Sequence, residues 1–319
     1  MHGNNLIDNK NFKLKYVFDV NSQLSKKISK NFNCRSIEKP EEAFKDDSID
    51  CIFISSSTST HLKLIYESVK NNKTVFCEKP LDLNLNKILN YEKKINSYKN
   101  KIQLGFNRRY DPGHKSLKKH LENRKIGKLE KIIITSRDPL APSIKYLKAS
   151  GGIFKDMMIH DFDLARFYLG NDEFKSIFAT GSNISNKYFN KLKDYELATS
   201  VLKTKSGVQC IITNSRHCTF GYDQRVELFG SKGMLISDNI KENEVSIYSN
   251  KATNTKSKLK HFFIDRYEIA YKKQLDDLVQ LIKKNKKPET GFSDGKISIQ
   301  IAESAIRSLK SKKFEKIKY

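Results

Sequence analysis

The stretch Ile49-Asp50-Cys51-Ile52-Phe53-Ile54-Ser55 is a near-continuous apolar run, which is typical of a parallel strand that is buried on both faces. Further strand patterns lie on either side of it, and helix patterns separate them. Strands that alternate with helices predict a doubly wound α/β sheet over about the first hundred residues. The expected strands cover 14–19, 49–55, 74–77 and 102–106, and the expected helices cover 22–30, 60–70 and 85–98.

After about residue 125 the pattern changes to short strands that follow one another. The segments 205–207 (Lys-Ser-Gly) and 230–233 (Gly-Ser-Lys-Gly) between them have typical turn residues. Successive strands joined by short turns predict an antiparallel sheet. The expected strands cover 132–136, 176–181, 198–204, 208–214, 225–229 and 234–237, and helices over 267–284 and 294–310 close the chain.

The start of the chain lacks a feature that a dinucleotide-binding half normally has. Such a half opens with a strand and Gly-x-Gly-x-x-Gly, whose backbone N–H groups hold the pyrophosphate. Here Gly3 is the only glycine before Gly105, and residues 1–7 have the pattern of the first helix. The first strand of such a sheet is central, so its loss would leave its neighbours with unpaired edges. We therefore expect a missing N-terminus, through a misassigned start or a decayed gene; the intact second strand argues against a fold that never had the loop.

Composition excludes several function classes. The net charge is +24, but the 60 Lys and Arg residues are spread over the whole chain, so no nucleic-acid partner is expected. No apolar run approaches the roughly 20 residues that span a bilayer, so no membrane association is expected. The five cysteines are scattered without a Cys-x-x-Cys pair, which indicates a reduced, cytoplasmic protein without a metal site.

Two short motifs have the chemistry of an active site. Lys79, in Cys77-Glu78-Lys79-Pro80, follows the strand 74–77 at the carboxyl end, where open α/β sheets bind ligands, and a cis bond at Pro80 would aim it inward. Asp156 and His160 are four residues apart, so a helix there would place both on one face. An imidazole suits a general base, and an ammonium stabilises a developing alkoxide. Together these groups could take a proton from a hydroxyl while a hydride leaves its carbon.

Each of these residues also has a structural interpretation. His160 could be a core or capping histidine, Asp156 could serve the first turn of a helix, and Lys79 could be one more surface lysine. Asp19, at the end of the expected second strand, could cap the next helix. As a ribose ligand, its carboxylate would accept from the hydroxyls and repel a 2′-phosphate, which favours NAD over NADP.

Five motifs follow one another along the chain: 78–80 (Glu-Lys-Pro), 108–112 (Arg-Arg-Tyr-Asp-Pro), 136–139 (Ser-Arg-Asp-Pro), 150–163, and 222–225 (Tyr-Asp-Gln-Arg). Their order resembles the Gfo/Idh/MocA oxidoreductases, and within that family the myo-inositol 2-dehydrogenases, over nearly the whole chain. Glu-Lys-Pro alone marks the broad family, and the other motifs make the resemblance more specific. His2 fits the histidine that often follows the glycine loop in such proteins.

The resemblance implies a fold of class α/β in two domains. Residues 1–108 would form an NAD-binding, Rossmann-type parallel sheet that lacks its first strand. Residues 109–319 would form an α+β domain with an open, mostly antiparallel sheet, which binds substrate and builds a homo-oligomer, a dimer or tetramer. The last segment of the chain could return to the first domain.

The resemblance also assigns roles to individual residues. Lys79, Asp156 and His160 correspond to the catalytic residues, and these three would also contact the substrate. A polyol needs several converging donors and acceptors, which Arg137, Asp138 and Tyr222 could supply, although they could equally be ordinary surface residues. The residues expected to bind NAD are Asp19, Ser55, Glu78 and Lys79.

The function implied is NAD-dependent oxidation of a cyclitol, with myo-inositol converted to 2-keto-myo-inositol (scyllo-inosose). Hydride would pass from the carbinol carbon to the nicotinamide, with His160 as general base. The alternatives are another sugar or cyclitol oxidoreductase of the same family, and a non-catalytic, truncated remnant.

Overall fold

The computed structural model describes residues 1–186 and 188–319 and divides the chain into two compact units. Unit 1 comprises residues 1–107 and 271–296, and unit 2 comprises residues 108–270 and 297–319. Each unit therefore consists of two separate stretches of the chain.

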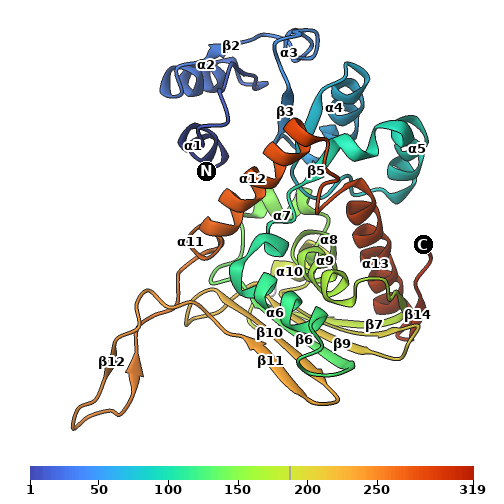
Figure 1. Cartoon of the computed structure of the whole chain (residues 1–319). Coiled ribbons are helices and arrows are strands. Elements are labelled where there is room, and N and C mark those ends of the chain that lie inside the picture. The colour runs from blue at the N-terminus through green and yellow to red at the C-terminus, as the bar shows by residue number, and fades with distance from the viewer. Residues whose placement is uncertain (187) are drawn as a thin grey trace. The chain divides into compact units, whose positions relative to one another are not determined.

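Unit 1 alternates short parallel strands with helices, as the sequence pattern predicts (Figure 1). The helix α2 shows why these elements form where they do, because the Asn21 side chain caps it by accepting from the backbone N–H groups of Gln23 and Leu24. The elements are α1 (His2–Asp8), β1 (Tyr16–Val17), α2 (Ser22–Asn31), β2 (Arg35–Ser36), α3 (Glu41–Phe44), β3 (Cys51–Ile54), α4 (Thr58–Lys70), β4 (Thr74–Cys77), α5 (Leu85–Ile95), the 3-10 helix η1 (Asn96–Lys101), β5 (Ile102–Leu104), most of α12 (Glu268–Lys284) and the first turn of α13 (Phe292–Ser311).

The parallel strands of unit 1 form two separate sheets. One has the order β1-β2 and the other the order β3-β4-β5, and every pairing is parallel. Among the described residues, β1 and β3 therefore each have one unpaired edge. This is the break expected at the place of a central strand in the order 3-2-1-4-5-6.

Residues 271–296 complete unit 1. Leu275, Leu278 and Leu281 of α12 pack with Leu6 of α1 and Phe76 of β4 in one hydrophobic cluster. The same segment also pairs with β5. The backbone N–H of Leu104 donates to the Thr290 carbonyl at 2.8 Å, and Gln274 Nε2 donates to the Leu104 carbonyl at 2.9 Å.

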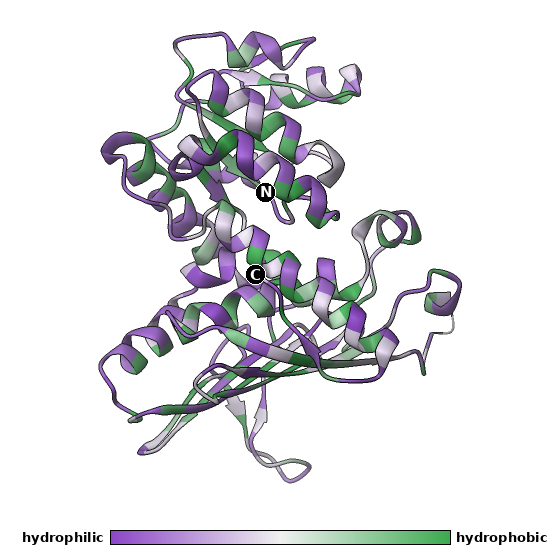
Figure 2. Ribbon diagram, turned by 90° about the vertical axis from the view of Figure 1, so that its right-hand side faces the viewer, coloured by the Kyte–Doolittle hydropathy of each residue, from purple (hydrophilic) through white to green (hydrophobic). Residues whose placement is uncertain are grey.

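Unit 2 is built on one seven-stranded sheet of order β11-β10-β6-β9-β8-β7-β14, in which only β6 and β9 pair in parallel. Hydrophobic and hydrophilic residues are interspersed along its strands (Figure 2). The elements are η2 (Asn107–Tyr110), α6 (Pro112–Glu122), β6 (Leu129–Arg137), α7 (Ile144–Ser150), α8 (Ile153–Asp156), α9 (Met158–Leu169), β7 (Phe174–Ser182), α10 (Tyr188–Lys191), β8 (Leu197–Thr204), β9 (Gln209–Ser215), β10 (Asp223–Gly230), β11 (Gly233–Ser237), β12 (Ser246–Ile247), β13 (Thr255–Lys256), α11 (Phe263–Arg266) and β14 (Glu315–Lys316).

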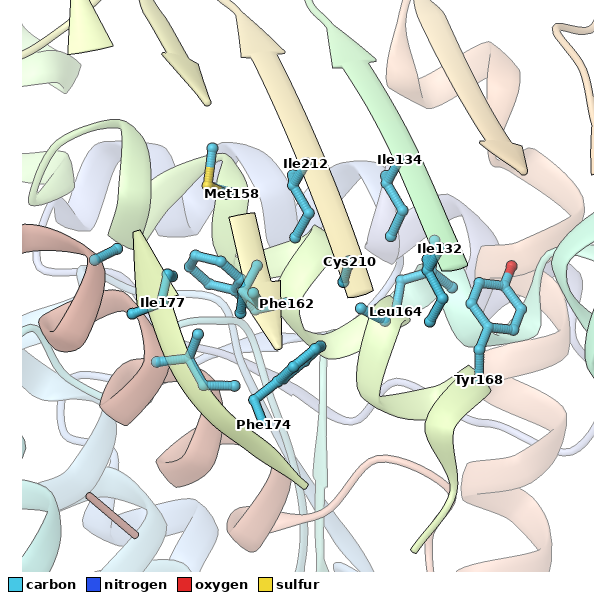
Figure 3. Packing of buried hydrophobic residues seen from close by; sticks show 14 of the residues in the cluster. Ile132, Ile134, Met158, Phe162, Leu164, Tyr168, Phe174, Ile177, Cys210 and Ile212 are labelled. Atoms are coloured by element: carbon cyan, nitrogen blue, oxygen red, sulfur yellow. The ribbon is translucent and has the colours of Figure 1, made fainter. Parts of the chain in front are cut away.

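The main core of unit 2 lies between one face of this sheet and the helices that cover it. Phe162 and Leu164 of α9 pack with Ile132 of β6 and Ile212 of β9, and all four side chains are at most 1% exposed (Figure 3). α13 contributes Ile301 and two alanines to the same cluster. Burial of such side chains is the largest favourable term in folding, at about 1.5–3 kcal/mol each.

The opposite face of the sheet presents a mostly apolar row of side chains, with Glu227 as its one charged member. Ile236, Glu227, Ile133, Ile211, Val201 and Phe178 are successive partners across six neighbouring strands. Ile236 is 56% exposed, and the other members of the row are partly exposed. A second row beside it consists of threonines at 135, 213, 199 and 180, flanked by Arg225.

Candidate active site

The site residues of unit 1 lie at the carboxyl ends of its strands. Ser55 directly follows β3, Glu78 and Lys79 directly follow β4, and Asp19 lies two residues after β1. Strands that run parallel end at the same edge of their sheet, and ligands bind at that edge in open α/β sheets.

The Glu78 carboxylate organises the turn that carries Lys79. Its Oε2 accepts from the backbone N–H of Lys79 at 3.2 Å, and its Oε1 lies 2.7 Å from His2 Nε2. Gly105 packs directly against this carboxylate, since a Cβ at that position would lie 2.7 Å from Oε2. The Lys79–Pro80 peptide bond is cis, as the sequence allowed. His61 lies behind this turn, with its ring nitrogens 2.8 Å from the Pro80 carbonyl oxygen and 3.0 Å from that of Ser56.

Asp19 does not cap α2, because Asn21 has that role. Instead one Asp19 oxygen accepts from the backbone N–H of Asn21 at 2.8 Å. The carboxylate is partly exposed and has a second oxygen that could accept from a ribose hydroxyl.

The residues of unit 1 fit the hydroxyl-bearing part of NAD. The carboxylate of Asp19 and the exposed hydroxyl of Ser55 are the group types that recognise ribose hydroxyls. Both lie at strand ends, where dinucleotides bind in open α/β sheets. The sequence itself contains no Gly-x-Gly-x-x-Gly segment.

Asp156 and His160 lie at the junction of two helices in unit 2. A single continuous helix was expected here, but Met157 separates α8 from α9, so Asp156 is the last residue of α8 and His160 the third of α9. The Met157 backbone nevertheless stays in the right-handed helical region, at φ −95° and ψ −58°. The two side chains are thus on successive turns, with Asp156 buried and His160 partly exposed.

The Asp156 carboxylate is bound by groups from two other segments of the chain. Oδ1 accepts from the Tyr146 hydroxyl at 2.6 Å, and Oδ2 accepts from Arg216 Nη1 at 3.1 Å. Tyr146 belongs to α7 and is 47% exposed, whereas Arg216 follows β9 and is 1% exposed. Neither residue was among the expected site residues. No spacing rule along the chain links Arg216 to Asp156, since 60 residues separate them.

The first turn of α9 is fixed by the residue after His160. The Asp161 carboxylate is fully buried and binds the Arg108 guanidinium, the Ser136 hydroxyl at 2.6 Å and Asn214 Nδ2 at 2.8 Å. Because Ser136 is on β6 and Asn214 on β9, this one carboxylate ties α9 to both parallel strands of the sheet.

The expected polyol ligands Arg137, Asp138 and Tyr222 lie at the carboxyl end of β6 and just before β10. Arg137 Nη1 donates to Asp223 Oδ2 at 2.7 Å, and the Asp138 backbone N–H donates to the Ser215 carbonyl. Tyr222 is 5% exposed and packs edge-to-face against Tyr267.

The neighbouring Asp223 carboxyl is held ionised. Burial alone would raise its pKa, but hydrogen bonds from Arg225 and Asn239, together with the charges of Arg225 and Arg137, hold the pKa below its ordinary value. Arg137 therefore has a fixed carboxylate partner, which orients its guanidinium.

Residues 1–186 and 188–319 contain no group of three or more His, Cys, Asp or Glu side chains placed to hold a metal ion. Among the same residues, every helix is too short or too polar to cross a membrane.

Comparison with known proteins identifies the family. Residues 1–106 match the oxidoreductase family with an NAD-binding Rossmann fold, and residues 114–236 match the GFO/IDH/MocA C-terminal domain. The myo-inositol 2-dehydrogenase of Thermotoga maritima is 38% identical over 89% of this chain and 84% of its own length. The crystal structure of a myo-inositol dehydrogenase from Corynebacterium glutamicum matches with a TM-score of 0.95 and 35% identity, over 100% of this chain and 95% of that one. The structure of scyllo-inositol dehydrogenase from Lactobacillus casei, with bound NAD(H) and scyllo-inositol, matches with a TM-score of 0.91 and 25% identity, over 99% and 95%. The chain therefore belongs to the Gfo/Idh/MocA family of NAD-dependent oxidoreductases and is of the inositol dehydrogenase type.

Proposed function

We propose that the protein oxidises myo-inositol to 2-keto-myo-inositol (scyllo-inosose) with NAD. The observation that carries the proposal is the placement of Asp156 and His160 on successive turns at the α8–α9 junction, in a chain with a 38% identical relative named for this substrate. Such a pair can bind a hydroxyl and remove its proton.

In the proposed reaction, His160 accepts the proton of the reacting hydroxyl. Imidazole ordinarily titrates near neutral pH, and the partial exposure of His160 lets the proton pass on to water. The Asp156 carboxylate, one turn earlier, orients this imidazole or accepts from a neighbouring hydroxyl. The Lys79 ammonium stabilises the negative charge that develops on the oxygen. NAD, when bound, supplies the acceptor for the hydride that leaves the carbinol carbon.

Other residues hold the two ligands. In this proposal Asp19, Ser55 and Glu78 bind the cofactor, and Arg137, Asp138 and Tyr222 bind hydroxyls of the ring. A polyol site needs several such groups with fixed directions, and the Arg137–Asp223 ion pair supports this role for Arg137. The free state of all five cysteines supports a reducing, cytoplasmic location.

The first prediction concerns the substrate. The full chain, supplied with NAD, should produce NADH fastest with myo-inositol when its kcat/KM is compared with those for scyllo-inositol and glucose. The rate of NADH formation measures each value. A higher kcat/KM for scyllo-inositol or glucose would be consistent with an oxidoreductase but would contradict myo-inositol as the preferred substrate. No NADH formation from any polyol, although NAD binds, would favour the non-catalytic alternative.

The second prediction concerns the general base. His160→Ala should lower kcat with myo-inositol by about 10²–10⁴-fold, because the hydroxyl proton loses its acceptor. NAD affinity, measured by calorimetric titration, should stay unchanged. The exposed His120→Ala serves as the matched control and should keep normal kcat. A near-normal kcat of His160→Ala at neutral pH would remove His160 from the mechanism.

The third prediction concerns Lys79. Lys79→Met should lower kcat/KM for myo-inositol at every pH tested, because an ammonium aimed at the reacting oxygen stabilises the transition state more than the ground state. Lys63→Met, at an exposed position of α4, is the control and should keep normal kinetics. Equal kcat/KM values for the two variants would show that Lys79 is a surface lysine.

We further propose that the protein is a homo-oligomer that packs through the open face of its sheet. The row from Ile236 to Phe178 crosses six strands and is apolar except for Glu227, and the threonine row beside it has short uncharged side chains. An exposed face of this kind can pack against the same face of a second copy about a two-fold axis.

The fourth prediction tests this surface. Ile133→Lys combined with Ile211→Lys places two charges in the middle of the row, so the molar mass from light scattering should fall to that of one chain. Leu140→Lys, at a 71% exposed position outside the sheet, should leave the mass unchanged. If both variants keep the mass of an oligomer, the contact lies elsewhere on the protein.

A further inference from the structure

Arg216 and its partner Asp194 hold both ends of α8, the single-turn helix that ends in Asp156. At the C-terminal end, Arg216 Nη1 donates directly to Asp156 Oδ2 at 3.1 Å. At the N-terminal end, Asp194 Oδ1 accepts from the backbone N–H of Ile153 at 2.8 Å, while its Oδ2 lies 3.6 Å from Arg216 Nη2. The Arg216 guanidinium thus links the two carboxylates, Asp194 and Asp156, that lie at opposite ends of α8.

Arg216, Asp156 and Asp194 form a clamp on α8, and this clamp is buried and closely packed. Arg216, Asp156 and Asp194 are 1%, 8% and 6% exposed, so their charges interact with little screening by water. Gly152, just before α8, has a φ of +84°, and a Cβ there would lie 3.0 Å from Asp194 Oδ1. Only glycine combines this backbone conformation with such a close approach of the carboxylate.

The clamp is also anchored to the sheet. The backbone N–H of Arg216 donates to the Glu196 carbonyl at 2.8 Å. The Glu196 carboxylate in turn accepts from the backbone N–H groups of Ile184, Ser185 and Asn186, which fixes the segment before α10. Because the backbone of Arg216 is fixed by these contacts, its side chain restrains the position of the Asp156 carboxylate.

We propose that Arg216 is a positioning residue, which keeps the Asp156 carboxylate ionised and fixes its orientation. Asp194 weakens this effect, because it interacts with the same guanidinium. The inference rests on the proposed function for the role of Asp156, but the arrangement of charges is independent of the substrate. An opposite charge favours the ionised carboxylate, and a second carboxylate nearby disfavours it.

Several other groups surround Asp156. Tyr146 of α7 donates its hydroxyl to Oδ1, and His160 lies one turn further along. Lys155, the preceding residue, pairs with Glu303 of α13 at 2.6 Å. Arg216 is a cation in direct contact with Asp156, at 3.1 Å.

The fifth prediction follows from the opposite signs of the two partners. Arg216→Met should raise the pKa of Asp156, by about 1–3 units, since it removes the adjacent cation. Asp194→Asn should lower the same pKa, because the guanidinium is then shared by one carboxylate fewer. Arg216→Lys should fall between the wild type and Arg216→Met, because it restores the charge but cannot reach both carboxylates as the guanidinium does.

The titration can be followed without any turnover. The full chain is labelled with ¹³C at the aspartate carboxyl carbons, and the Asp156 resonance is assigned from its loss in Asp156→Asn. Arg266→Met breaks a different buried pair, with Asp111, and serves as the control that should leave the Asp156 titration unchanged. In the active enzyme, the acid limb of kcat/KM should shift in the same directions as the NMR titration, and kcat of Arg216→Met should fall about 10–100-fold through misplacement of the carboxylate.

The outcomes separate the inference from the proposed function. An unchanged Asp156 titration in both Arg216→Met and Arg216→Lys, or shifts of the same sign in Arg216→Lys and Asp194→Asn, would overturn the role of Arg216. A merely structural role would lower stability in Arg216→Lys and Arg266→Met alike without moving the titration. If the Asp156 pKa shifts in opposite directions in Arg216→Met and Asp194→Asn but the protein does not oxidise inositol, the role of Arg216 is supported and the proposed substrate is rejected.

Discussion

The buried carboxylate of Asp161 is the contact on which the geometry of unit 2 depends most. It binds one guanidinium, one hydroxyl and one amide, and these come from three different segments of the chain. A fully buried charge with this many donors is tolerated, but removal of its partner cation typically lowers the free energy of unfolding by about 3–5 kcal/mol. The hydrophobic core under α9 sets the distance between helix and sheet, whereas Asp161 sets the position of the helix along the sheet. His160, its neighbour in the chain, is therefore placed by a residue that takes no part in chemistry.

Most of the fold could be predicted from periodicity, because helices and strands with one buried face repeat their apolar residues at characteristic intervals. The strands of the large sheet except the edge strand β14, and the closing helices α12 and α13, were expected within a few residues of their observed bounds. The prediction was less accurate where polar residues end an element. The strand expected over 14–19 is reduced to β1 (Tyr16–Val17), and the helix expected over 85–98 gives way to the 3-10 helix η1 after Ile95.

The site was only partly predictable, for a physical reason. Lys79, Asp156 and His160 occur in short motifs, so their spacing along the chain was enough to mark them as candidates. Arg216 reaches Asp156 from 60 residues away along the chain, and Asp194 contacts Arg216 rather than Asp156, and such contacts depend on the fold as a whole. The break at Met157 was missed for a related reason. Asp156 is bound by Tyr146 and Arg216 from outside its own helix, and local helix propensity carries no information about those contacts.

The division of the chain has a consequence for how the protein can be dissected. The chain passes between the units three times, at 107/108, 270/271 and 296/297, and each of these points lies within a helical segment. Neither unit is therefore encoded by one continuous piece of gene. A fragment that ends at residue 107 omits the part of α12 whose leucines fill the core of unit 1, and a fragment that begins at residue 108 carries that part without the strands it covers. Exchange of either unit with a relative would thus require three joints inside helical segments, so the two halves are constrained to change together.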